Sequence, residues 1–226
     1  MKSLSCVIID GDGPGETAHH LTLELERRGH RAAKLGGCMD VEAFIEMSAR
    51  VCPQRIIFAP PAGDECGALD LDLAGPIPER LVPMVAIGVK RFLALAQAAI
   101  LTLMGNGGGQ IWVADWDDTF EYHLPLPCSP LQAEARAAAV RAMAKECTRL
   151  GIKINSLSVQ PVAEIFPRER FNEARDDLKS YALRYKPVSC KAVAAQLCEF
   201  LEQPDLPMAG AMVGLGTGVC QGHLIQ

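Results

Sequence analysis

The stretch IIDGDGPGET, residues 8–17, ends an apolar run in a glycine-rich turn and then continues into a segment with helical character. This order of strand, turn and helix is how a nucleotide-binding loop is built in α/β proteins. The turn itself contains three acidic residues and three glycines: Asp10, Gly11, Asp12, Gly13, Gly15 and Glu16. The segment therefore indicates a strand–helix junction. Because a pyrophosphate at this turn would face negative charge, the segment does not by itself indicate a nucleotide ligand.

Apolar runs and helical segments alternate along the rest of the chain. We predict strands at 5–10, 55–59, 110–115, 152–157 and 209–215, a short extended piece at 31–34, and helices at 15–28, 40–51, 81–104, 130–150 and 188–202. Strands separated by helices of this length imply βαβ units, and therefore a parallel sheet with helices on both faces. We expect a single α/β domain over residues 1–226, with any ligand at the carboxyl ends of the strands.

The composition excludes several classes of protein. Apolar residues make up 49% of the chain and charged residues 22%, which is typical of a compact folded protein. The net charge of -5 gives no basic surface for nucleic acid. The nine cysteines form no CxxC pair, and the adjacent His19 and His20 point in different directions on a helix, so we expect reduced thiols and no metal site. The N-terminus shows no signal peptide, and a cytoplasmic location is expected.

Two helices have wider apolar surfaces than a helix on one side of a sheet needs. The segment 81–104 is apolar nearly all round, but Lys90 and Arg91 disfavour a membrane span, so we expect protein to cover it on most sides. The segment 130–150 is rich in alanine, which suits close packing of helices and is also simply a good helix former. The second apolar face favours a subunit interface built from these two helices.

Three stretches carry a family resemblance: GGGQIWVAD (107–115), AKECTRLGIKINSLSVQPV (144–162) and RYKPVSCKAVAAQLCEFLEQPDLPMAGAMVGLGTG (184–218). They resemble, in order, the strand before the catalytic serine, the stretch ending in GIRVNxxxPGPV, and the C-terminal helix and strand of the short-chain dehydrogenase/reductase (SDR) family. The resemblance covers about residues 5–218. It implies a Rossmann-like doubly wound parallel sheet, here with a shortened third-strand region around 35–41 and a shortened segment around 116–128.

The resemblance also implies a catalytic tetrad, in which a tyrosine with a lysine-lowered pKa acts as general acid and base. The asparagine, serine, tyrosine and lysine positions of that tetrad fall on or near Gly88, Trp116 (or Asp115), Ser129 and Ala133. No Tyr-x-x-x-Lys occurs at any register of the sequence, and this absence does not depend on alignment. We therefore expect no catalytic residue at the family positions.

The turns that hold the cofactor in the family are also altered. Glu16 or Thr17 and Ala18 stand where the later glycines of TGxxxGxG belong. One carboxylate about 4 Å from a phosphate repels it by roughly 4 kcal/mol at an effective dielectric near 20. That is about half of the roughly 8 kcal/mol behind a micromolar affinity. Asp12, Glu16 and Thr17 are expected to stabilise the start of the helix instead.

Two further turns have lost the residues that approach the dinucleotide. Pro60 and Pro61 begin the segment that replaces the NNAG turn, and prolines have no N–H to donate. Val159 and Gln160 replace the proline-glycine pair that lies near the nicotinamide. We therefore predict that this chain binds no NAD(P).

These observations favour a non-catalytic subunit that pairs with an active NAD(P)-dependent SDR paralogue. The resemblance implies a heterotetramer through 81–104, 130–150 and the C-terminal strand, with NAD(P) in the partner and a hydroxy or keto substrate such as a CoA ester. The two-subunit 2-(hydroxybenzyl)succinyl-CoA dehydrogenase of anaerobic toluene degradation, which contains an inactive SDR subunit, is a precedent.

The alternative is a diverged enzyme or a ligand-binding regulatory protein that uses the cleft without a nicotinamide cofactor. Tyr122, His123 and Cys128 lie near the vacated site in the sequence and are candidates for a rebuilt centre. Trp112 and Trp116 are expected to fill the cofactor cleft, or otherwise to stack on a ligand.

Overall fold

The computed structural model describes residues 3–10, 15–36, 40–60, 81–117, 130–160, 162–165, 168–169, 172–173 and 187–216. Its elements are β1 (Ser5–Ile9), α1 (Glu16–Arg27), β2 (Arg31–Leu35), α2 (Val41–Val51), β3 (Arg55–Phe58), α3 (Leu81–Gly105), β4 (Gly109–Trp116), α4 (Pro130–Cys147), the 3₁₀ turn η3 (Thr148–Leu150), β5 (Ile152–Val159), α6 (Cys190–Glu202) and β6 (Met212–Leu215). The predicted strands and helices are all present, with ends that differ by a few residues.

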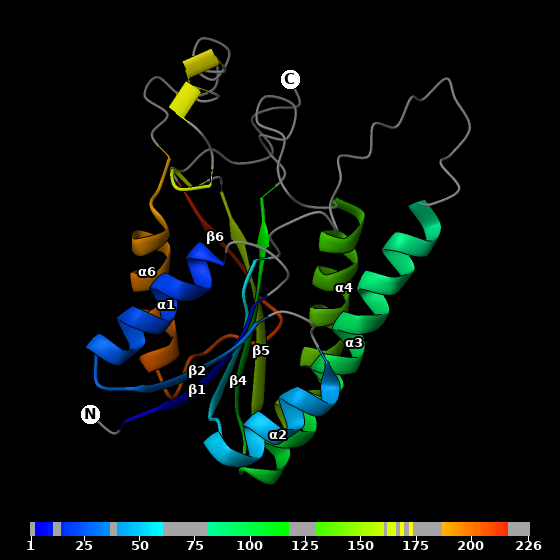
Figure 1. Ribbon diagram of the computed structural model, residues 1–226. Coiled ribbons are helices and arrows are strands. Elements are labelled where there is room, and N and C mark those ends of the chain that lie inside the picture. Colours follow the sequence, from blue (N-terminus) through cyan, green and yellow to red (C-terminus); the bar gives the residue numbers. More distant parts are fainter. Residues whose placement is uncertain are drawn as a thin grey trace.

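The six strands form one parallel sheet in the order β2-β1-β3-β4-β5-β6 (Figure 1). From β1 the chain first moves outward to β2 and then returns to place β3 on the other side of β1. This is the reversal of a doubly wound fold, which brings the carboxyl ends of β1 and β3 to the switch point.

The shortened third-strand region also agrees with the structure. β2 is the edge strand of the described sheet, and only residues 36–40 separate it from α2. Residues 37–39 of this connection lie outside the described part of the chain.

Both faces of the sheet are covered by helices, as the alternation of buried side chains requires. Along β1, Cys6 and Ile8 pack with α1 and α6, whereas Val7 and Ile9 pack with α2, α3 and α4 (Figure 1). All four side chains are buried. A strand that is buried on both faces has a continuous apolar sequence, and for this reason the first ten residues predict β1 well.

Helix α3 is more exposed than the sequence predicted. The segment Val85–Gly105 is long and apolar enough to cross a membrane by length and composition, yet only 28% of the apolar window is buried inside the protein. The exposed fractions are 59% for Ile87, 43% for Leu93, 59% for Leu101 and 45% for Met104. The expectation that protein covers this helix on most sides is therefore wrong for the single chain, because the sheet, α2 and α4 reach only its inner face.

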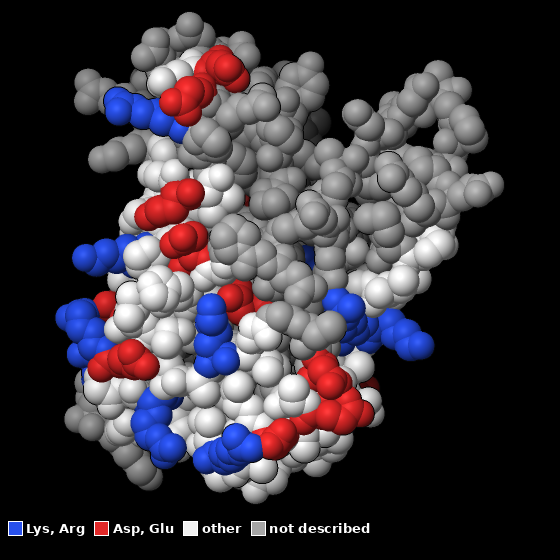
Figure 2. Space-filling view, viewed as in Figure 1, with Lys and Arg blue, Asp and Glu red and all other residues white. Residues whose placement is uncertain are grey.

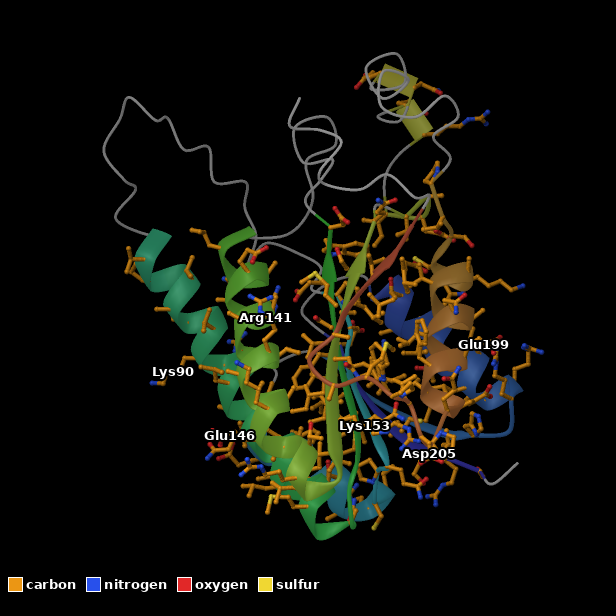
Figure 3. All side chains as sticks on the ribbon, turned by 180° about the vertical axis from the view of Figure 1, so that it is seen from behind. Lys90, Arg141, Glu146, Lys153, Glu199 and Asp205 are labelled. Carbon is orange, nitrogen blue, oxygen red and sulfur yellow. The ribbon has the colours of Figure 1, made fainter. Side chains whose placement is uncertain are left out.

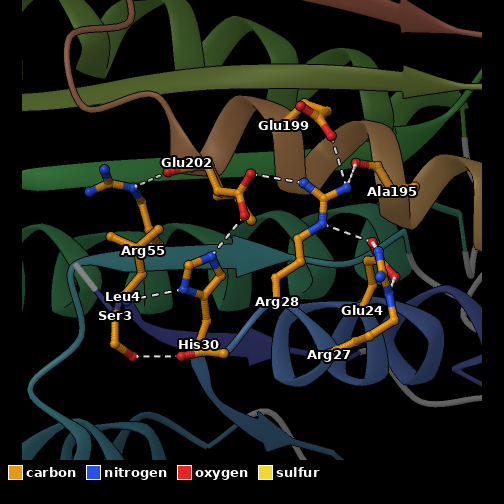
Figure 4. A network of polar contacts seen from close by, with 12 residues as sticks. Ser3, Leu4, Glu24, Arg27, Arg28, His30, Arg55, Ala195, Glu199 and Glu202 are labelled. Carbon is orange, nitrogen blue, oxygen red and sulfur yellow. Dashed lines mark hydrogen bonds and ion pairs between the residues drawn. The ribbon is translucent and has the colours of Figure 1, made fainter. Parts of the chain in front are cut away.

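A polar network ties α1 to α6 near the amino ends of the strands (Figure 4). Glu24 accepts hydrogen bonds from Arg27 at 2.7 Å and from Arg28 at 2.8 Å, and these hold its pKa at about 2. Arg28 also bonds Glu202 at 2.8 Å, and Glu202 in turn lies 2.9 Å from Nε2 of His30. On the face shown in Figure 2, charged side chains of both signs are interspersed among the described residues.

Candidate functional site

The candidate site is the edge of the sheet where β1, β3, β4 and β5 end. Of the residues that the sequence singled out, the structure describes Asp10, Gly15, Glu16, Pro60, Gly88, Trp116 and Ala133. Outside the described residues lie Gly11, Asp12, Gly13, Pro61 and Ser129, together with Tyr122, His123 and Cys128. The rebuilt centre suggested for the last three residues therefore stays a hypothesis.

At the end of β1 the carboxylate of Asp10 packs directly on the first turn of α1. Asp10 is 3% exposed, and a Cβ atom added to Gly15 would stand only 1.9 Å from its Oδ2 atom. Lys34 on β2 donates to the same oxygen at 3.2 Å. Burial raises the pKa of Asp10, and the hydrogen bond from Lys34 opposes the rise. A side chain of the protein thus lies at the helix N-terminus, which in dinucleotide-binding folds receives the pyrophosphate.

The start of α1 differs from the prediction in one respect. Gly15 is the N-cap residue, and no side chain caps it. The hydroxyl of Thr17 instead lies 3.6 Å from Sγ of Cys190 on α6, because Thr17 is on the buried face of the helix. Glu16 is in the first turn as predicted, and it lies 3.9 Å from His20.

A buried ion pair lies where β4 ends. Nε of Arg136 donates to Oδ2 of Asp115 at 3.1 Å, and Nη2 donates to Oδ1. The two residues are 8% and 9% exposed, with Asp115 from β4 and Arg136 from α4. Burial raises the pKa of Asp115, while the charge and hydrogen bonds of Arg136 oppose the rise. Arg136 follows Ala133 by one helical turn, so the pair lies beside the positions to which the sequence resemblance assigns the serine and the lysine of the tetrad.

The asparagine position of the family is also occupied by another side chain. A Cβ atom added to Gly88 on α3 would come within 2.5 Å of Oε1 of Gln132 on α4. Gln132 is 3% exposed, so its amide is packed against the backbone of α3. Any side chain at position 88 would have to displace it.

Among the described residues, two further features belong to this edge of the sheet. A Cβ atom on Gly216 would stand 2.0 Å from Oε1 of Gln160, so the Gln160 side chain lies against the backbone after β6. The cavity beside Asp115, Trp116 and Ala133 has a volume of about 60 Å³, whereas binding sites for small molecules commonly measure roughly 300–1,000 Å³. In the described part of the chain, no group of three or more His, Cys, Asp and Glu residues is placed to hold a metal.

The two tryptophans have different positions. Trp116 is 3% exposed and borders the small cavity, in agreement with the cleft-filling role predicted for it. Trp112 is fully buried in the core, stacked on Phe200 of α6 at a ring distance of 5.3 Å, so the predicted place for it in the cleft is wrong. Its Nε1 donates to Oε1 of Gln110 at 3.1 Å, which satisfies the indole in the core.

No protein-family model matches the sequence, and no curated protein matches it. Solved structures match over nearly the whole chain. The TT0495 protein from Thermus thermophilus has a TM-score of 0.74 at 18% identity, with 97% of this chain and 99% of that chain covered.

Two further solved structures are similar. L-sorbose reductase from Gluconobacter frateurii, complexed with NADPH and L-sorbose, has a TM-score of 0.71 at 12% identity, covering 96% of this chain and 97% of that chain. A short-chain type dehydrogenase/reductase from Mycobacterium ulcerans has a TM-score of 0.70 at 12% identity, covering 100% of this chain and 92% of that chain. Likeness at these identities shows the fold: the chain has the Rossmann-like α/β fold that these three proteins share.

Proposed function

We propose that this chain is a diverged SDR subunit that carries out no oxidoreduction itself and associates with an active NAD(P)-dependent SDR paralogue. The observation that carries the proposal is the buried Asp115–Arg136 pair at the catalytic edge of the sheet. A carboxylate that accepts a guanidinium N–H at each of its two oxygens is a poor general acid or base, because both oxygens are held by a cation that cannot itself be deprotonated.

The absent tetrad supports the same proposal. The sequence holds no Tyr-x-x-x-Lys, and Gly88 lacks the amide that the family places at this position. Gln132 fills the space in front of Gly88, so a single substitution there does not rebuild the site.

The negative charge of Asp10 disfavours a dinucleotide at the start of α1. Asp10 lies at the N-terminus of α1 with only Lys34 as a described ion-pair partner, and a dinucleotide there would bring further negative charge against it. Two negative charges about 4 Å apart repel by roughly 4 kcal/mol at an effective dielectric near 20. Isothermal titration with NAD+, NADH and NADPH should therefore show no micromolar binding. Micromolar binding of any of the three would contradict the proposal.

The partner surface that we propose is the outer face of α3 and α4. Ile87, Leu93, Leu101 and Met104 of α3 are exposed, and Leu131 at the start of α4 is 49% exposed. Contiguous exposed apolar side chains on helices are a common mark of protein interfaces. Lys90 projects from the outer side of α3, where it would form part of a polar rim (Figure 3).

Two variants and a matched control test this surface. Ile87→Glu and Leu101→Glu each place a charge in the proposed interface, and Ile45→Glu on α2 makes the same change at a residue that is 53% exposed elsewhere. In a native pull-down from the source cell, the unmodified chain and the Ile45→Glu variant should recover an SDR with an intact Tyr-x-x-x-Lys. The two α3 variants should lose it, because a buried unpaired charge is strongly unfavourable.

Two outcomes would contradict the proposal. One is a chain that is monodisperse alone in light scattering and recovers no SDR paralogue. The other is equal recovery of the paralogue with all three variants, which would place the interface away from α3.

A further inference from the structure

A second cavity lies at the opposite edge of the sheet, where β3, β4 and β5 begin. Its volume is about 520 Å³. Its lining includes Gln54 and Arg55 at the start of β3, Asn106 after α3, and Lys153 on β5. This edge shares no lining residue with the cavity at Asp115, so ligand binding here is independent of the proposed function.

Arg55 is a buried cation that the protein satisfies only in part. It is 7% exposed, and burial lowers the pKa of its guanidinium. Nε donates to the carbonyl of Leu201 at 2.9 Å, and Nη1 donates to the carbonyl of Gln54 at 2.9 Å. A guanidinium has five N–H donors, so three have no protein acceptor among the described residues. In Figure 4 the terminal nitrogens of Arg55 point away from the carboxylate of Glu202.

Lys153 brings a second cation to the same cavity. Its Nζ donates to the carbonyl of Leu206 at 2.5 Å, and Lys153 is not among the side chains that form ion pairs within the described residues. Figure 3 shows Lys153 on β5 toward the end of the sheet where this cavity lies. Glu202 also lines the cavity, but its carboxylate is already paired with Arg28 at 2.8 Å and lies 2.9 Å from Nε2 of His30.

The glycines of the cavity have a structural explanation and do not form a phosphate loop. Gly108 donates its N–H to Leu103 at 2.8 Å, and Gly109 donates its N–H to Gly151 at 3.1 Å. A Cβ atom on Gly109 would stand 2.5 Å from the carbonyl oxygen of Gln54, so close packing of backbones requires glycine there. The charged donors that line the cavity are therefore those of Arg55 and Lys153.

We propose that this cavity binds a small organic anion through a carboxylate or phosphate group, held by the free N–H groups of Arg55 and by the ammonium of Lys153. A guanidinium presents parallel donors that match two oxygens of such a group. An unpaired buried charge is strongly unfavourable, and a bound anion removes that penalty. The volume leaves space for a ligand larger than an inorganic ion.

The test is a titration of the isotope-labelled chain with inorganic phosphate and, separately, with malonate at constant ionic strength. Saturable amide shifts are expected at Asn106–Gly109 and Gly151, and the probe with the lower Kd identifies the preferred group. Lys153→Met and Arg55→Lys should each raise that Kd about tenfold or more, because each removes a charge-assisted bond or the fork geometry.

Arg31→Met is the matched control. Arg31 is an exposed cation that begins β2 and does not line the cavity, so its removal should leave the Kd unchanged. The proposal is overturned if neither probe gives saturable shifts, or if the shifts lie at the Asp115 edge. Lys153 is half-buried, so Lys153→Met is expected to fold. The proposal is also overturned if this variant binds both probes as tightly as the unmodified chain.

Discussion

Replacement of Arg136 with methionine perturbs the ion pair on which the proposed function depends. Methionine keeps the apolar stem that packs along α4 and removes the guanidinium that bonds both oxygens of Asp115. Asp115 then remains 8% exposed in the native packing with no cation described near it. The change is therefore a test of charge, with little change in volume.

The expected loss in the free energy of unfolding is about 3–5 kcal/mol at neutral pH, which is typical when one partner of a buried pair is removed. Asp115→Asn combined with Arg136→Met removes both charges. We expect this double variant to lose less than the sum of the single variants, by about 1–3 kcal/mol. Arg141→Met, at an exposed arginine of the same helix, should change stability by less than about 0.5 kcal/mol.

The loss should depend on pH in a defined direction. Burial and the charge of Glu134 raise the pKa of Asp115, and only Arg136 opposes them. Without Arg136 the folded pKa rises further above its unfolded value of about 3.9. A raised folded pKa contributes stability below the unfolded pKa, and that contribution is lost as the pH rises through the folded pKa. The deficit of Arg136→Met should therefore be small near pH 4 and full near pH 7.

Urea unfolding followed by circular dichroism at both pH values measures these quantities. A deficit below about 1 kcal/mol that is the same at both pH values would refute the reasoning. Strict additivity in the double variant would refute it as well, since it would mean that the two side chains do not interact.

Three further predictions follow from the described contacts. Gly88→Ala alone should lower the free energy of unfolding by about 1 kcal/mol, because its Cβ would stand 2.5 Å from Gln132. In a Gln132→Ala background the same substitution should raise the free energy of unfolding by up to about 1 kcal/mol, since alanine is the better helix former. Urea unfolding that showed the same sign in both backgrounds would contradict this. Glu24→Gln should lower the free energy of unfolding by about 2 kcal/mol at neutral pH. This difference should shrink as the pH falls below 4.5 and vanish near the folded pKa of Glu24, which is about 2. Acid unfolding curves of the two proteins that stay parallel would argue against the network. Iodoacetamide should modify the exposed Cys52 and leave Cys6 intact, because burial raises the pKa of Cys6 to about 12; peptide mass mapping that found Cys6 labelled in the folded chain would contradict the burial.

The sequence predicted the fold because the signals for it are local. An apolar run such as residues 5–10 has to be a buried strand when a glycine turn and a helix follow it. The repetition of this unit predicts a parallel sheet with helices on both faces, whereas the strand order and its reversal at β1 are seen only in the structure. The missing Tyr-x-x-x-Lys and the carboxylates of the first turn are likewise visible in the sequence alone, since they need only spacing and charge.

Only the tertiary structure decided which side chains fill the vacated site. Arg136 reaches Asp115 across 21 residues, and Gln132 lies against Gly88 on another helix. An arginine within an alanine-rich helix that packs on the sheet was a signal for the first pair, but its partner depends on how α4 crosses the end of β4.

The same reason explains two of the predictions that failed. The sequence of 81–104 shows that the helix is apolar. The exposure of its outer face, such as the 59% of Leu101, depends on which elements pack against the helix. Trp112 and Trp116 lie four residues apart on one face of β4, yet Trp112 stacks on Phe200 of α6 and Trp116 borders the small cavity. Contacts between residues far apart in the chain are set by how the layers pack, and no local pattern records them.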